Sequence, residues 1–186
     1  METELNKFDN SWYWKNYNKS SFIKRIFWII IGNTFINSYL PTPIFFKIWL
    51  LRLFGAKIGA HVVIKPKANI KFPWLLEIGE DCWIGEEVWI DNLAKVKIGN
   101  NVCISQGALL LTGNHDFTLS AFDLKIGEII IENGVWIGAK SIVCLNVTCE
   151  DHSVLTVGSV TSKNLQSFGI YRGNPAELIK RRVITD

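Results

Sequence analysis

From position 58 to about position 161 the chain repeats with a period of six residues, and this period constrains its fold more than any other feature. Each hexad begins with an aliphatic residue or a cysteine, and a small or β-branched residue mostly follows four positions later. The first set comprises Ile58, Ile64, Ile70, Ile78, Ile84, Ile90, Ile98, Ile104, Leu110, Ile131, Ile137, Val143, Cys149 and Leu155. A fixed period of this kind is typical of a parallel β-helix.

Each hexad supplies one short strand and one turn, so three hexads close one triangular coil. The two apolar positions point inward and stack on their equivalents one coil away. A single coil cannot bury its own apolar face, so we expect roughly five stacked coils between positions 58 and 166. Glycine often follows the aliphatic residue, as at Gly59, Gly79 and Gly138. We predict that these glycines sit where the chain turns and needs backbone freedom.

Composition indicates one soluble globular unit. The 186 residues are enough for one sizeable core, and 48% of them are hydrophobic, including 8 Trp and 11 Phe. Such an apolar surplus is typical of chains that bury part of their surface at subunit interfaces. The net charge of +3 is too small to indicate a nucleic-acid partner. The 4 cysteines form no CxxC pair, and Cys82 and Cys149 take inward positions, which predicts a cytoplasmic protein without disulfides.

Residues 1–55 lie before the repeat and predict an N-terminal helical cap. Ser20 and Ser21 can begin a helix that runs from position 22 to about 38, and the proline pair at 41–43 separates it from a second helix over 44–54. The apolar run at 26–31 is too short to span a bilayer.

Two interpretations of these helices stay open. They could pack on the first coil and cover its open sheet edge. They could also rest on the inner face of the cell membrane as an interfacial pair, with Lys24, Arg25, Lys47 and Arg52 toward anionic lipid.

The repeat breaks once, between Leu110 and Ile131, and we predict an inserted loop at 112–128 that leaves one corner of the coil. Interruptions of a solenoid often mark its binding face. The loop contains His115, and histidine is the usual general base near neutral pH. We therefore predict that His115 is catalytic. Asp116 could orient it, although an aspartate at this place is also good turn chemistry.

These motifs resemble those of hexapeptide-repeat acyltransferases, most closely the colanic acid biosynthesis type of acetyltransferase. The most specific matches are Thr112-Gly113-Asn114-His115-Asp116 and Gly173-Asn174-Pro175-Ala176, the latter followed by a basic segment expected to form a short helix. Further matches cover 89–99, 102–108 and 134–138.

The resemblance implies an all-β chain, with a left-handed parallel β-helix over 56–166, N-terminal helices, and a C-terminal tail and helix over 167–186. It implies a homotrimer with active sites between subunits and acetyl-CoA as co-substrate, without a metal. His115 would take a proton from a saccharide hydroxyl during direct transfer, in surface polysaccharide biosynthesis. The acceptor could be nucleotide- or lipid-linked. An amine of an amino sugar remains an alternative acceptor, and a non-catalytic binding module is the alternative of another class.

Carried over residue by residue, the resemblance assigns acceptor contacts to Asn92 and, more weakly, Asp91. Backbone contacts to CoA fall to Ala139, Val157 and Ser162, and cations near its phosphates to Lys163 and Lys180. The pattern departs from the family at Thr156-Val157, which replaces Gly-Ala, and at Glu177, where an arginine could sit. The three histidines lack the spacing of a metal site, which disfavours a metal-dependent relative of the same fold.

Overall fold

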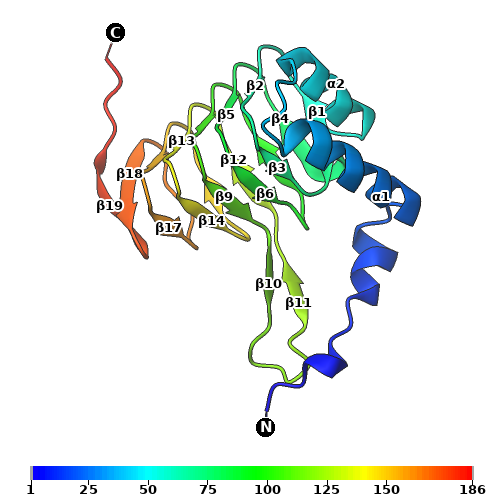
Figure 1. Cartoon of the computed structure of the whole chain (residues 1–186). Helices are drawn as coiled ribbons and strands as arrows, with labels where there is room; N and C mark the ends of the chain where they lie inside the picture. The colour runs from blue at the N-terminus through cyan, green and yellow to red at the C-terminus, as the bar shows by residue number, and fades with distance from the viewer. Residues whose placement is uncertain (1, 186) are drawn as a thin grey trace.

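The computed structural model describes residues 2–185, and its strands form a parallel β-helix with helices at its N-terminal end (Figure 1). Three sheets form the faces of the triangular coil. We name them sheets A, B and C. Sheet A contains β1 (Lys57–Ile58), β4 (Leu76–Ile78), β7 (Val96–Ile98), β12 (Ile129–Ile131) and β15 (Thr148–Cys149). Sheet B contains β2 (Val63–Ile64), β5 (Trp83–Ile84), β8 (Cys103–Ile104), β13 (Trp136–Ile137), β16 (Val154–Leu155), β18 (Gly169–Gly173) and β19 (Ala176–Arg181). Sheet C contains β3 (Asn69–Ile70), β6 (Trp89–Asp91), β9 (Leu109–Leu111), β14 (Ile142–Cys144) and β17 (Val160–Thr161).

The hexad positions form the core, as the period predicts. On sheet B, Ile84 pairs with Ile104, and Ile104 pairs with Ile137 on the next coil. All three side chains are fully buried. Stacking of like side chains at one-coil intervals removes apolar surface from water at every repeat, which is why the period must be kept.

The predicted role of the glycines that follow these aliphatic residues is wrong. A methyl group on Gly79 would lie 2.6 Å from the carbonyl oxygen of Gly99, one coil away. Glycine is therefore needed there because the coils approach closely. The left-handed backbone at the corners falls mostly on other residues, such as Asp81, Asn101 and Lys140.

Two helices and two wider turns precede the β-helix. In chain order these are η2 (Tyr13–Tyr17), α1 (Phe22–Ile31), η3 (Gly32–Ile36) and α2 (Ile44–Leu53). Two further short turns are η1 (Leu5–Lys7), before η2, and η4 (Pro73–Leu75), between β3 and β4. Ser21 caps α1 by accepting a hydrogen bond from the backbone N–H of Lys24. The α-helix ends earlier than predicted, because the chain changes to a π-helical turn at Gly32. Within residues 2–185, none of the helices has the length and apolar character needed to cross a bilayer.

The helices cover the edge of the first coil with three side chains, one for each sheet. Arg52 donates to the carbonyl oxygen of Ile58 in β1 at 2.6 Å, and Lys47 donates to that of Ile64 in β2 at 3.4 Å. The indole N–H of Trp28 donates to the carbonyl oxygen of Ile70 in β3 at 2.9 Å. These carbonyls belong to strands that have no neighbour on this side, so the side chains replace the missing ladder.

The segment expected as a loop forms an antiparallel hairpin, β10 (Gly113–His115) with β11 (Leu124–Ile126). It projects from the corner between sheets C and A, and the N-terminal segment runs to its tip (Figure 1). There the backbone N–H of Glu4 donates to the carbonyl oxygen of Ser120 at 2.8 Å.

The short C-terminal helix expected for the tail is absent from the described residues, and that prediction is wrong. Residues 176–181 form β19, which pairs antiparallel with β18 at the end of sheet B. That helix was implied only by the resemblance to the family. The edge of β18 offers backbone donors and acceptors to residues 176–181, and pairing with this edge replaces the expected helix.

Candidate active site

The ring of His115 is held in one tautomer. Its Nδ1 lies 2.8 Å from the carbonyl oxygen of Phe122 on the opposite side of the hairpin. A carbonyl oxygen can only accept, so the neutral imidazole carries its proton on Nδ1 and its lone pair on Nε2. A free lone pair on a fixed ring is what a general base requires.

Two aromatic rings enclose His115. Phe122 stacks on the imidazole with ring centroids 4.5 Å apart and planes 10° apart, and Phe8 contacts it at 5.4 Å. These residues were not predicted from the sequence. Phe122 lies in the non-repeating segment, where no period assigns it a direction, and Phe8 is more than 100 residues away in the chain.

The carboxylate of Asp116 is engaged within the hairpin. It lies 2.8 Å from Nζ of Lys125 and accepts a hydrogen bond from the backbone N–H of Thr118 at 3.0 Å. Lys125 and then Thr118 lower the pKa of Asp116 to about 2. In the described part of the chain Asp116 makes no hydrogen bond to His115, so its contacts stabilise the turn.

Replacing Asp116 by asparagine is expected to reduce acetyl transfer only severalfold, through loss of hairpin order. The carboxylate has a lowered pKa, so its stabilising contacts are complete above the ordinary value of 3.8 and are lost only as the pH falls through about 2. The pH dependence of kcat/KM between pH 5 and 9 should therefore keep its shape, which initial rates on both proteins would measure. A displaced profile would instead show that Asp116 tunes the base.

The two residues predicted to contact the acceptor are bonded to the chain itself. Asn92 is fully buried, with its Nδ2 donating to the carbonyl oxygen of Phe72 at 2.7 Å and its Oδ1 accepting from the N–H of Phe72 at 2.9 Å. Asp91 pairs with Lys71, Nζ to Oδ1, at 2.7 Å. Asn92 thus ties two neighbouring coils together where β3 ends.

The Asn92→Ala variant is expected to lose about 3 kcal/mol of unfolding free energy, because both backbone groups of Phe72 would be left buried and unpaired. Urea titration followed by tryptophan fluorescence would measure the loss. A variant of unchanged stability with a raised KM for the acceptor would contradict this structural role and favour direct contact.

The residues predicted to contact CoA fall into three places. Ala139 and Val157 lie on consecutive turns at the corner between sheets B and C, where the N–H of Gly158 donates to the carbonyl oxygen of Ala139 at 2.9 Å. Ser162 and Lys163 follow β17 at the next corner, the one from which the hairpin leaves two coils earlier. Lys180 lies in β19.

Near the end of the β-helix, some cationic side chains bind the chain itself and others do not. Arg181 donates to the carbonyl oxygen of Ser167, and Arg182 to that of Gly134. Both arginines therefore fix the last hairpin. Lys163 and Lys180 are exposed, and within residues 2–185 neither pairs with a carboxylate, so these two remain available to an anion.

A cleft of about 340 Å³ lies on sheet B and extends to the B–C corner. Gly85, Ser105 and Gln106 line it on the turns that precede Ala139, together with the exposed ring of Trp83. Across the described residues, no group of three or more His, Cys, Asp and Glu side chains could hold a metal ion.

Comparison with known proteins finds relatives that are named acetyltransferases. No family model matches the sequence. The colanic acid biosynthesis acetyltransferase WcaF of Escherichia coli is 35% identical over 173 residues, which cover 92% of this chain and 94% of the relative. The galactoside O-acetyltransferase of E. coli is 26% identical over 134 residues, covering 70% of this chain and 66% of the relative.

Among solved structures, a hexapeptide-repeat acetyltransferase of Vibrio cholerae in complex with acetyl-CoA superimposes with a TM-score of 0.78. The match covers 86% of this chain and 87% of that one, at 22% identity. The parallel β-helix predicted from the hexads, and the left hand implied by the resemblance, are confirmed by this likeness.

Proposed function

Because the chain belongs to the hexapeptide-repeat acetyltransferases, as its likeness to WcaF over almost its whole length shows, we propose that it transfers acetyl from acetyl-CoA to a saccharide hydroxyl. Membership establishes the acetyl-CoA-dependent activity. The hydroxyl acceptor is supported by the galactoside O-acetyltransferase among the relatives, and surface polysaccharide biosynthesis by the relative named for colanic acid. The observation that carries the mechanism is the fixed tautomer of His115 on the projecting hairpin.

In this mechanism, Nε2 of His115 takes the proton of the acceptor hydroxyl while the acceptor oxygen attacks the thioester carbonyl. The carbon–sulfur bond then breaks, and the imidazolium returns its proton to the departing thiolate, so that the ester and free CoA are formed. No acetyl group becomes attached to the protein. The hydrogen bond to Phe122 holds the ring in one orientation, because the ring cannot rotate without losing it. A backbone N–H would stabilise the negative charge on the carbonyl oxygen.

The residues available for CoA support a homotrimer. The Ala139–Val157 corner and the Ser162–Lys163 corner lie at different edges of one β-helix, and a groove between two copies could use one edge from each. Trp83 and Trp136 flank Cys103 in sheet B, and both rings are about half exposed. Two exposed tryptophans that lie two coils apart on the same sheet give this face an apolar character that a neighbouring subunit would bury.

The proposed acceptor is a nucleotide- or lipid-linked saccharide available in the cytoplasm or at the inner face of the cell membrane. Its contacts would come from the neighbourhood of Asp91 and Asn92, which lie one coil before the base of the hairpin. Asp91 would reach it directly and Asn92 would act through the turn that it holds at Phe72.

The test is acetyl-CoA turnover by purified protein with a panel of nucleotide-linked, lipid-linked and amino sugars, followed as free CoA. We expect release that depends on the acceptor and a product ester that is cleaved by mild base. A base-stable product would identify the acceptor as an amine. No release with any acceptor, together with no acetyl-CoA binding by calorimetry, would overturn the enzymatic function and favour a binding module.

A further inference from the structure

Helix α1 turns its apolar side chains outward and its cations inward. Phe22, Ile23, Phe27 and Ile30 are 57 to 67% exposed. In contrast, Nζ of Lys24 lies 4.6 Å from the ring of Trp74, and the guanidinium of Arg25 lies 4.0 Å from that of Trp14. A surface helix of a soluble protein shows the opposite arrangement, with apolar residues toward the core and charges toward water.

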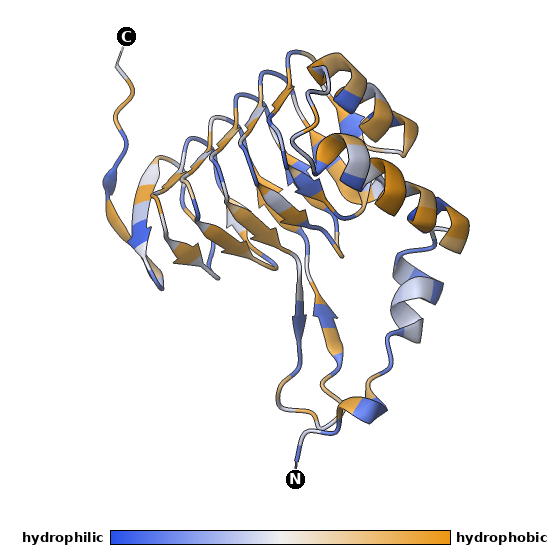
Figure 2. Cartoon of the chain, viewed as in Figure 1, coloured by the Kyte–Doolittle hydropathy of each residue, from blue (hydrophilic) through white to orange (hydrophobic). Residues whose placement is uncertain are grey.

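Helix α2 continues the same surface. Phe45, Trp49 and Leu53 are 53 to 75% exposed, whereas Lys47 and Arg52 are the side chains that bind carbonyls of the first coil. Figure 2 shows both helices as mostly hydrophobic on their free sides, at the end of the molecule that carries no other layer. We call these seven exposed residues of α1 and α2 the outer helix face: Phe22, Ile23, Phe27, Ile30, Phe45, Trp49 and Leu53.

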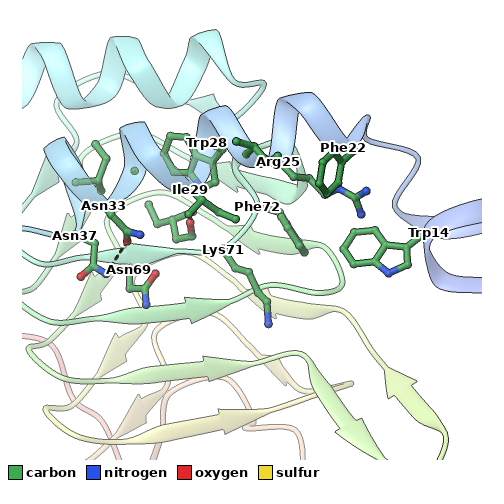
Figure 3. Close-up of a pocket in the computed structure, with 14 residues that line it drawn as sticks. Trp14, Phe22, Arg25, Trp28, Ile29, Asn33, Asn37, Asn69, Lys71 and Phe72 are labelled. Atoms are coloured by element: carbon green, nitrogen blue, oxygen red, sulfur yellow. Dashed lines mark hydrogen bonds between the residues drawn. The ribbon is translucent and has the colours of Figure 1, made fainter. Parts of the chain in front are cut away.

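A pocket of about 480 Å³ opens beside this face, between α1 and strand β3. Its lining is largely apolar, and Arg25 lies at one end against Trp14 and Phe22 (Figure 3). Among the described residues no carboxylate pairs with Arg25, and its Nε is buried without a hydrogen-bond partner. An unpaired guanidinium beside an apolar cavity is suited to a phosphate that carries an apolar chain.

Charge is distributed unevenly along the chain. Residues 10–76 contain ten Lys and Arg and no Asp or Glu, whereas the rest of the chain contains ten Lys and Arg and seventeen Asp and Glu. Both helices therefore belong to a segment of net charge +10, of which Lys57, Lys67 and Lys71 pair with Glu77, Glu87 and Asp91 outside it. A second copy meeting this face through α1 and α2 would bring further cations and no carboxylate from either helix.

We propose that the outer helix face docks the protein on an anionic lipid bilayer. The aromatic and aliphatic side chains enter the headgroup region with both helices in the plane of the surface, and the exposed Lys15 and Lys19 before α1 attract the lipid phosphates. The expectation that Lys47 and Arg52 face lipid is wrong, because both side chains bind carbonyls of the first coil. Arg25 binds one phosphate at the mouth of the pocket. The β-helix then stands above the bilayer, because the helices cover its N-terminal end (Figure 1).

The experiment is sedimentation of the full chain with vesicles of phosphatidylcholine alone or mixed with phosphatidylglycerol. We expect binding to the mixed vesicles that weakens as salt is raised, since the attraction between cations and headgroups is screened. The double variant Phe27→Ser/Ile30→Ser is expected to bind at least about tenfold more weakly, since both side chains lose apolar contact with lipid. Neither residue lines the pocket or belongs to the buried core.

The matched control is Val183→Ser, which removes a side chain that is 80% exposed at the other end of the chain and should bind vesicles like the wild type. His115→Ala should also bind normally, so a failure of the catalytic proposal would leave this one standing. Equal sedimentation with neutral and anionic vesicles, or unchanged binding of the double variant, would overturn the proposal. A change of oligomeric state in the double variant, seen by size-exclusion chromatography, would show that the face is an interface between copies.

Discussion

Replacement of His115 by alanine is expected to lower acceptor-dependent CoA release by a factor of about 10² to 10⁴, the usual contribution of a positioned general base. In the folded hairpin the ring is held by Phe122 and Phe8, and Nε2 is the nitrogen with a free lone pair. Alanine offers no replacement for this lone pair. Steady-state rates at saturating acetyl-CoA would measure the effect.

The loss should fall on kcat while acetyl-CoA affinity remains, because the residues expected to hold CoA lie on other corners of the β-helix. Calorimetry on the variant checks this separation. His152→Ala serves as the matched control, since this histidine lies at a corner and is packed against Phe168, away from the hairpin. Equal activity in His115→Ala and the wild type would exclude His115 as the base.

The Trp28→Ala variant is expected to lose about 4 kcal/mol of unfolding free energy, within the range for removal of a buried aromatic side chain. Trp28 is 3% exposed, packs against Phe54 with ring centroids 5.1 Å apart, and donates its N–H to the carbonyl oxygen of Ile70. The substitution leaves a cavity under α1 and an unpaired carbonyl on β3. Urea unfolding followed by circular dichroism would measure the loss.

Two further variants show how much of this loss comes from the hydrogen bond and how much from burial of the ring. Trp28→Phe keeps an apolar ring but removes the donor, and is expected to lose about 1 to 2 kcal/mol. Trp49→Ala removes an indole that is 53% exposed on α2, and should lose less than about 1 kcal/mol. If Trp28→Ala were no more harmful than Trp49→Ala, the cap would not contribute to the stability of the β-helix.

The β-helix could be predicted from the sequence because each inward position must hold an apolar side chain, and Ile84, Ile104 and Ile137 do so at one-coil intervals. The position of the hairpin followed from the same rule, since the period fails where the chain leaves the coil. The role of the Ile-Gly glycines could not be read this way. A glycine needed for turning and one needed for close approach, such as Gly79, have the same letter in a sequence.

Contacts between segments that are far apart in the chain could not be predicted from the sequence. Phe8 reaches His115 only because the N-terminal segment meets the hairpin near its tip, and Asn92 bonds to Phe72 across a coil. The tail helix was expected from the resemblance alone, whereas residues 176–181 pair with the edge of β18. Any CoA groove between two copies needs surfaces that one chain cannot display, so those assignments stay predictions.

The three side chains that close the first coil also determine where the solenoid stops. Parallel coils with open strands at the end could accept the coil of another molecule, and end-to-end addition would continue into a fibre. With Arg52, Lys47 and Trp28 on the carbonyls of Ile58, Ile64 and Ile70, one acceptor of each first-coil strand is already occupied. The N-terminal helices would thus have to move aside before another β-helix could add to this end.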